Sequence, residues 1–118
     1  MIKGIGVDII ELDRIKQSIK RNPRFVQRIL TEGEHLRYKA SGAGRQVEFL
    51  AGRFAAKEAF AKATGTGIGK LGFHDVEILS NERGAPVMTA TGYESWNVWV
   101  SISHSKDHAI AQVVLEEG

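Results

Sequence analysis

Two carboxylates stand at positions where the surrounding pattern favours apolar side chains. Asp8 lies in the segment 5–10, which otherwise contains only glycine and β-branched residues. Glu58 lies in an Ala-rich stretch, and at about 100° per residue its side chain falls in the same helical sector as Phe54 and Val47. Burying an unpaired carboxylate costs several kcal/mol, so each acid needs a cation or hydrogen-bond donors.

Two interpretations of these acids stay open at the level of the sequence. In the first, each acid forms an ordinary salt bridge, with Lys57, Lys62 or Arg53 as candidate partners. In the second, both acids converge on one hard divalent ion. Mg²⁺ is the usual choice where few carboxylates act together with substrate phosphates. Spacing along the chain does not decide between them.

The residues that follow Glu58 fit an anionic ligand. Lys62 lies four residues further on, so it can project from the same helix face. The glycine-rich run 65–70 lets backbone N–H groups approach a phosphate closely. It is not a Walker loop, because Thr64 and Leu71 replace the required Gly and Ser or Thr. A plain connector between a helix and a strand is the alternative interpretation.

One histidine ends a strand-like segment near the C-terminus. With a period of two, His104 shares a face with Val98, Val100 and Ile102. It fits either a hydrogen-bonded structural histidine or a phosphate contact. No Ser–His–Asp triad can be assigned from this spacing.

The charges are unevenly distributed along the chain. The 118 residues carry 16 Lys and Arg and 14 Asp and Glu, a net charge of +2. Between Arg14 and Arg28 there are six basic residues and no acidic one, so the rest of the chain is net acidic. Such a run favours an anionic partner, against the alternative of a solvated helix face. A non-catalytic nucleic-acid-binding module is one candidate function, but it leaves Asp8 and Glu58 unexplained.

Composition excludes several other classes of protein. The chain has no Cys, which excludes disulfides, thiolate metal sites, iron–sulfur clusters and a thiol nucleophile. With 42% hydrophobic and 25% charged residues, the chain is typical of a globular protein, and its length predicts one domain. We expect no membrane span and no signal peptide, and therefore a cytoplasmic location.

These residues are positioned by predicted elements that are mainly helices in the first half of the chain and strands in the second half. A strand is predicted at 2–10, followed by helices at 11–20, 25–30, 31–40 and 47–63. Thr31 and Glu34 form a possible capping box at the start of the third helix. Strands follow at 73–80, 86–91, 97–104 and 109–116. One strand, a helical block and an antiparallel meander predict the α+β class.

In combination, these motifs resemble the small bacterial phosphopantetheinyl transferases, the holo-acyl-carrier-protein synthases of fatty acid synthesis. The resemblance covers essentially the whole chain. It rests on four stretches in the expected order: the strand at 4–9, the helix at 49–59 with its glycine loop at 65–69, the segment 84–86, and the segment 101–105.

The resemblance implies a fold in which a long central helix packs on a mostly antiparallel sheet, as one transferase domain over residues 1–118. It implies transfer of 4′-phosphopantetheine from coenzyme A to a serine hydroxyl of apo-acyl carrier protein, releasing adenosine 3′,5′-bisphosphate. Asp8 and Glu58 would hold Mg²⁺ against the pyrophosphate, and Lys62 would stabilise or protonate the leaving phosphate. Either Glu58 or a metal-bound water would accept the serine proton. Contacts to the nucleotide are implied for Arg45, Arg53, Gly65, Thr66, Gly84, Pro86 and His104.

The resemblance also assigns partners. Acyl carrier protein would dock on a basic surface, which we call the basic strip: Arg14, Arg21, Arg24 and Arg28, with Phe25 as an apolar anchor. The family's small members form homotrimers whose sites are shared between neighbouring subunits, so we expect a homotrimer here. Neither nucleic acid nor a membrane is an expected partner.

Overall fold

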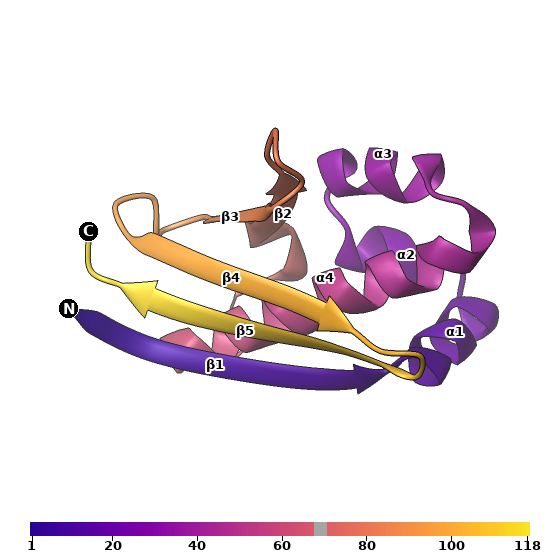
Figure 1. Ribbon diagram of the computed structural model, residues 1–118, viewed down its shortest axis with the longest axis horizontal. Helices are drawn as coiled ribbons and strands as arrows, with labels where there is room; N and C mark the ends of the chain where they lie inside the picture. The colour runs from indigo at the N-terminus through magenta and orange to yellow at the C-terminus, as the bar shows by residue number, and fades with distance from the viewer. Residues whose placement is uncertain (68–70) are drawn as a thin grey trace.

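The computed structural model describes residues 1–67 and 71–118, in which one strand is followed by a block of helices and then by the remaining strands (Figure 1). In chain order they are β1 (Ile2–Glu11), α1 (Leu12–Arg21), α2 (Arg24–Ile29), α3 (Glu32–Ala40), α4 (Ala43–Thr64), the 3-10 turn η1 (Phe73–Asp75), β2 (Val76–Ser80), β3 (Pro86–Ala90), β4 (Asn97–His104) and β5 (His108–Glu116). Strands β1, β5 and β4 form an antiparallel sheet in that order, and β2 and β3 form a separate antiparallel pair. The predicted α+β class is confirmed.

Apart from shifts of one residue, two predicted boundaries and one predicted strand pairing were wrong. Helix α4 begins at Ala43 rather than at residue 47, so Gly44 is helical. The segment predicted as one strand from 73 opens with the turn η1. The predicted meander is interrupted, because β3 and β4 share no ladder in the described chain. The loop between them instead packs Tyr93 edge-on against Phe60 of α4, with ring centroids 5.2 Å apart.

Helix α4 is the central element of the core. It runs behind the three-stranded sheet in Figure 1, and most of its residues from Leu50 to Ala63 are buried. The side facing β1 and β5 carries mainly alanine, which keeps the helix–sheet distance short. Gly65, with a φ of 78°, ends the helix in the left-handed conformation that glycine adopts without strain.

Strand β1 lies directly on the backbone of α4. On its helix-facing side Gly4 and Gly6 precede Asp8. A Cβ at Gly4 would overlap the carbonyl oxygen of Ala63, and one at Gly6 would overlap that of Ala59. Only glycine permits this approach, and it carries the next helix-facing side chain, that of Asp8, up to the helix.

The opposite face of the sheet is exposed, and along β1 it is apolar. Ile5 is 61% exposed, Val7 51% and Ile9 61%. Across β5 and β4 the same face becomes mixed: Val114, Ile110 and the exposed Trp99 are apolar, whereas Gln112, Ser101 and Ser103 are polar. These exposures mean that no element within residues 1–67 and 71–118 covers this face.

The contact between β1 and α4 predicts a sharp difference between two Gly→Ala variants. Gly6→Ala should lower the free energy of unfolding by about 1–3 kcal/mol, the usual cost of overpacking a filled contact. Gly44→Ala is the matched control, because a Cβ there meets nothing within 4 Å. Being inside α4, it should be neutral or stabilise the protein by less than about 1 kcal/mol. Urea unfolding followed by circular dichroism measures both, and equal stability of the two variants would contradict the close contact.

Candidate functional site

Asp8, Glu58 and Lys62 meet at the outer edge of β1. The Lys62 ammonium donates to Asp8 Oδ1 at 3.0 Å and to the carbonyl oxygen of Val7 at 3.0 Å. Lys62 lies one helical turn beyond Glu58 on α4, so all three side chains reach the same place. Of the three predicted salt-bridge partners, Lys62 is the one that pairs with Asp8.

The two carboxylates repel each other. Partial burial raises the pKa of Glu58 above its ordinary value, the negative charge of Asp8 raises it further, and Lys62 opposes both effects. A divalent cation between the two acids would remove this repulsion.

The donor set at this edge fits Mg²⁺ rather than a metal that needs a full protein cage. Within residues 1–67 and 71–118, no three His, Asp or Glu side chains group as metal ligands. Mg²⁺ is commonly held by one or two carboxylates, with substrate phosphates and waters completing the shell. Asp8 and Glu58 supply that number of oxygen ligands.

The end of α4 adds two of the predicted nucleotide contacts to this edge. Gly65 and Thr66 are exposed and follow Lys62 closely. The Thr66 hydroxyl lies 2.8 Å from the Thr64 hydroxyl, which holds the first residues after the helix in place. The rest of the predicted phosphate loop, residues 68–70, lies outside the described residues.

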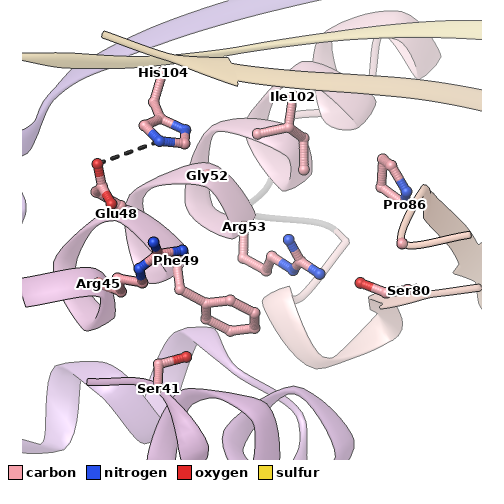
Figure 2. A pocket seen from close by; sticks show the side chains of 11 residues that line it. Ser41, Arg45, Glu48, Phe49, Gly52, Arg53, Ser80, Pro86, Ile102 and His104 are labelled. Carbon is pink, nitrogen blue, oxygen red and sulfur yellow. Dashed lines mark ion pairs between the residues drawn. The ribbon is translucent and has the colours of Figure 1, made fainter. Parts of the chain in front are cut away.

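A pocket of about 320 Å³ opens on the other side of the molecule, between the first half of α4, the end of β4 and the β2–β3 turn (Figure 2). The remaining predicted nucleotide contacts all line it: Arg45, Arg53, Gly84, Pro86 and His104. Sequence spacing had not indicated that they share one cavity.

Arg53 is the buried cation of this pocket. Its Nε donates to the carbonyl oxygen of Ile78 at 3.3 Å, and its guanidinium carbon lies 4.4 Å from the centroid of the Phe49 ring. Burial lowers the pKa of Arg53, with Arg37 adding to the shift and Glu34 opposing it. Figure 2 shows the guanidinium between Phe49 and the side of the pocket formed by Ser80 and Pro86. Its terminal nitrogens are placed to bind an anion bidentately.

His104 lies at the mouth of the same pocket. It is on the helix-facing side of β4 with Ile102, as the period-two pattern predicted. Its Nε2 lies 3.2 Å from Glu48 Oε2 (Figure 2). Glu48 was missed from the sequence, because nothing local indicates that α4 and the end of β4 approach each other at this point.

The acids and the pocket lie at opposite edges of the sheet. Asp8 is on β1 and His104 is on β4, with β5 between them. The described chain therefore brings the predicted site residues together in two groups rather than one. We call Asp8, Glu58, Lys62, Gly65 and Thr66 the acidic half-site, and the lining of the pocket the nucleotide half-site.

The basic strip covers α1 and α2. Arg14, Arg21, Arg24 and Arg28 are exposed, and α1 begins directly after β1, the strand that carries Asp8. Phe25 is only half-exposed, because its ring packs toward Phe54 at a centroid distance of 6.2 Å. No helix in residues 1–67 or 71–118 has both the length and the apolar character needed to cross a bilayer.

Lys57 does not belong to either half-site. Its ammonium is fully buried and pairs with Glu34 Oε1 at 2.6 Å. Burial lowers the pKa of Lys57, and Glu34 opposes the shift. The predicted capping box of Thr31 and Glu34 is confirmed, but it gave no sign that Glu34 also accepts a hydrogen bond from a lysine of α4.

Comparison with known proteins identifies relatives along the whole chain. A family model described as the 4′-phosphopantetheinyl transferase superfamily matches residues 4–113. A holo-[acyl-carrier-protein] synthase from Oceanobacillus iheyensis is 58% identical over 116 residues, covering 98% of each chain. A crystal structure of a holo-(acyl-carrier-protein) synthase from Bacillus anthracis in complex with CoA (3′,5′-ADP) is 50% identical, covers 100% of this chain and 99% of that one, and superposes with a TM-score of 0.92. The Helicobacter pylori synthase in complex with coenzyme A is 36% identical, covers 95% of this chain and 99% of that one, and superposes with a TM-score of 0.84.

The electrostatics of Glu58 predict that the acidic half-site destabilises the metal-free protein. A carboxyl whose pKa is raised by folding stabilises the fold when protonated, and that contribution is lost as the pH rises through the raised pKa. Glu58→Gln should therefore raise the Tm at pH 7 in chelator-treated buffer and have little effect below pH 4. Mg²⁺ should raise the Tm of the unsubstituted protein by binding between the two acids, and Glu58→Gln should abolish that gain.

Glu82→Gln, in an exposed turn, is the matched control and should leave the Tm and its response to Mg²⁺ unchanged. Thermal unfolding with and without the ion measures both effects. A lower Tm for Glu58→Gln at pH 7 would show that the carboxylate is stabilised by its neighbours rather than strained.

Proposed function

Because this chain belongs to the 4′-phosphopantetheinyl transferase superfamily and, within it, to the holo-[acyl-carrier-protein] synthases, we propose that the two half-sites divide one transfer reaction between them. The chain transfers 4′-phosphopantetheine from coenzyme A to a serine hydroxyl of apo-acyl carrier protein, and adenosine 3′,5′-bisphosphate is released. The serine oxygen bonds to the pantetheine-side phosphorus of the pyrophosphate, and the bridging P–O bond breaks. The observation that carries the assignment of roles is the convergence of Asp8, Glu58 and Lys62 at one edge.

Asp8 and Glu58 are the residues that would hold Mg²⁺. The ion supplies charge neutralisation at the pyrophosphate when it is bound. Asp8 is on β1 and Glu58 is on α4, and the close contact between these two elements brings the carboxylates near each other without a flexible loop. Either Glu58 or a water held by the ion would accept the serine proton.

Lys62 is the cation of the acidic half-site. Without substrate its ammonium is held by Asp8 and the Val7 carbonyl, and more than half of its side chain is exposed. A flexible lysine in this position can turn from Asp8 to the leaving phosphate. There its positive charge stabilises the negative charge that develops on the departing oxygen.

The nucleotide half-site holds the adenosine bisphosphate part of coenzyme A. Arg53, Arg45 and His104 supply the charges and donors for its phosphates. The adenosine end lies against the turn before β3, where Gly84 has a φ of 80° and Asn81 Oδ1 accepts from the backbone N–H of Ala85. Such a turn is rigid, so it presents Pro86 as a fixed apolar surface.

The separation of the half-sites supports a shared site in a homotrimer. One chain places its acids and its pocket at opposite edges of the sheet, while coenzyme A must contact both groups. The exposed face of β1, β5 and β4, which is apolar along β1, is of the kind that a second copy covers. We propose that each acidic half-site works with the nucleotide half-site of a neighbouring copy.

The basic strip is the proposed docking surface for the carrier protein. Its four exposed arginines carry no acidic residue between them, and it begins directly after β1, the strand that carries Asp8. Carrier proteins are acidic, so the complementary charge raises the encounter rate and orients the serine. We further propose a cytoplasmic location and one transferase domain over residues 1–118, the second supported by a continuous buried core.

The reaction is tested by incubating the protein with apo-acyl carrier protein, coenzyme A and Mg²⁺ and following the mass of the carrier. We expect a gain of one phosphopantetheine group. Asp8→Asn and Glu58→Gln should each lower the rate by at least about 100-fold, as expected for loss of transition-state electrostatics, and chelation should stop the unsubstituted enzyme. Folded variants that turn over normally would contradict the metal assignment. An unmodified carrier, with a reference transferase active in parallel, would contradict the function.

The shared site is tested by mixing two inactive variants. Asp8→Asn disables the acidic half-site and Arg53→Met the nucleotide half-site. Random reassembly of equal amounts should restore about one quarter of the sites, because a shared site needs one intact half from each variant. Asp8→Asn mixed with Glu58→Gln is the matched control, with no recovery expected, since both affect the same half. No recovery in the first mixture, despite subunit exchange seen by native mass spectrometry, would place each site within one chain.

A further inference from the structure

Four side-chain and backbone groups form a closed ring next to the nucleotide half-site. Arg53 Nε donates to the carbonyl oxygen of Ile78 at 3.3 Å. The backbone N–H of the same Ile78 donates to Glu34 Oε2 at 2.7 Å. Glu34 Oε1 accepts from Lys57 Nζ at 2.6 Å. Lys57 is four residues after Arg53 on α4, so the helix closes the ring.

The buried members of the ring are fully hydrogen-bonded. The Lys57 ammonium also donates to the carbonyl oxygens of Ile29 at 2.7 Å and Phe73 at 3.0 Å, which uses all three of its protons. Both the Lys57 and the Glu34 side chains are 0% exposed. Because desolvation offsets most of the attraction, such a pair is weak evidence for stability. The contribution of this pair is to orientation, because each hydrogen bond fixes the position of one side chain relative to its neighbour.

Ile78 is the residue through which the ring connects strand β2 to helices α3 and α4. Strands β2 and β3 form a two-stranded sheet, so one edge of β2 has no strand partner in the described chain. At that edge, the Ile78 N–H donates to Glu34 of α3, and the Ile78 carbonyl oxygen accepts from Arg53 of α4. The strand is therefore attached to both helices through one residue, two positions before the pocket-lining Ser80.

We propose that Glu34 and Lys57 are positioning residues for nucleotide binding. Lys57 orients the Glu34 carboxylate, Glu34 holds Ile78, and the Ile78 carbonyl holds Arg53 Nε so that the other guanidinium nitrogens face the ligand's phosphates. Neither residue reaches the pocket, since both are fully buried, so they act only through Arg53. The inference rests on the proposed role of Arg53 in binding the bisphosphate part of coenzyme A.

Two substitutions at one position separate the hydrogen bond from the charge. Glu34→Leu removes the acceptor of the Ile78 N–H, whereas Glu34→Gln retains one. Titration with adenosine 3′,5′-bisphosphate should show a Kd raised about tenfold for Glu34→Leu and less than about threefold for Glu34→Gln. The KM for carrier protein should be unchanged in both, because the basic strip is on other helices.

Leu115→Ala and Arg53→Met are the matched controls. Leu115→Ala lowers stability by leaving a cavity at the end of the sheet away from both Asp8 and His104, so it should bind the bisphosphate as the unsubstituted protein does. If Glu34→Leu binds as tightly as Leu115→Ala while Arg53→Met binds weakly, the positioning proposal is wrong and the proposed function stands. If Arg53→Met also binds normally, the role of Arg53 in the proposed function fails.

A second measurement uses the unsubstituted protein and does not depend on the folding of any variant. If the ring positions Arg53 for its ligand, binding must tighten the ring in return, because coupling between sites is reciprocal. Adenosine 3′,5′-bisphosphate should therefore slow hydrogen exchange at the Ile78 amide more than at the Ala111 amide of β5. Equal effects at the two amides would overturn the proposal.

Discussion

The contact between the backbones of β1 and α4 is the constraint on which the acidic half-site depends. Gly4 and Gly6 have no side chains, so β1 rests on the carbonyl groups of α4, and Asp8 arrives beside the helix as the next residue on that face. A strand kept away by ordinary side chains would hold Asp8 further from Glu58. The geometry of two charged groups is thus set by two residues that carry no functional group.

Helix α4 carries the cation of the pocket, a buried lysine and two residues of the acidic half-site on different parts of its surface. Arg53 faces the pocket beside β2, Lys57 points into the buried interior, and Glu58 and Lys62 face the edge of β1. Positions 53 and 57 differ by about one turn, while 58 is rotated by about 140° from 53. One rigid helix therefore fixes the acidic half-site and the nucleotide half-site relative to each other, although they lie at opposite edges of the sheet.

Local patterns were enough to predict most elements. They did not show that Asp8, Glu58 and Lys62 meet, which only the resemblance to a known family implied. The strand at 97–104 and the capping box at Thr31 are coded by neighbouring residues, so alternation and spacing reveal them. The pairing of Lys57 with Glu34 could not be predicted in this way. Glu34 lies 23 residues earlier in the chain, and its role in the capping box of α3 already accounts for its presence. The same limit applies to β1. Its apolar run fits a strand buried on both faces, and the chain alone does not say that one face is left exposed.

The pairing of β1 with β5 has a consequence for how the chain is made. Ile2 is in register with Glu116, and Figure 1 shows the two termini side by side. On the ribosome β1 emerges long before β5, so the three-stranded sheet cannot close until β5 has also emerged. Until then the isoleucines and valine of β1 have no partner strand, which makes the nascent chain dependent on late, long-range pairing and exposed to misassociation while it waits.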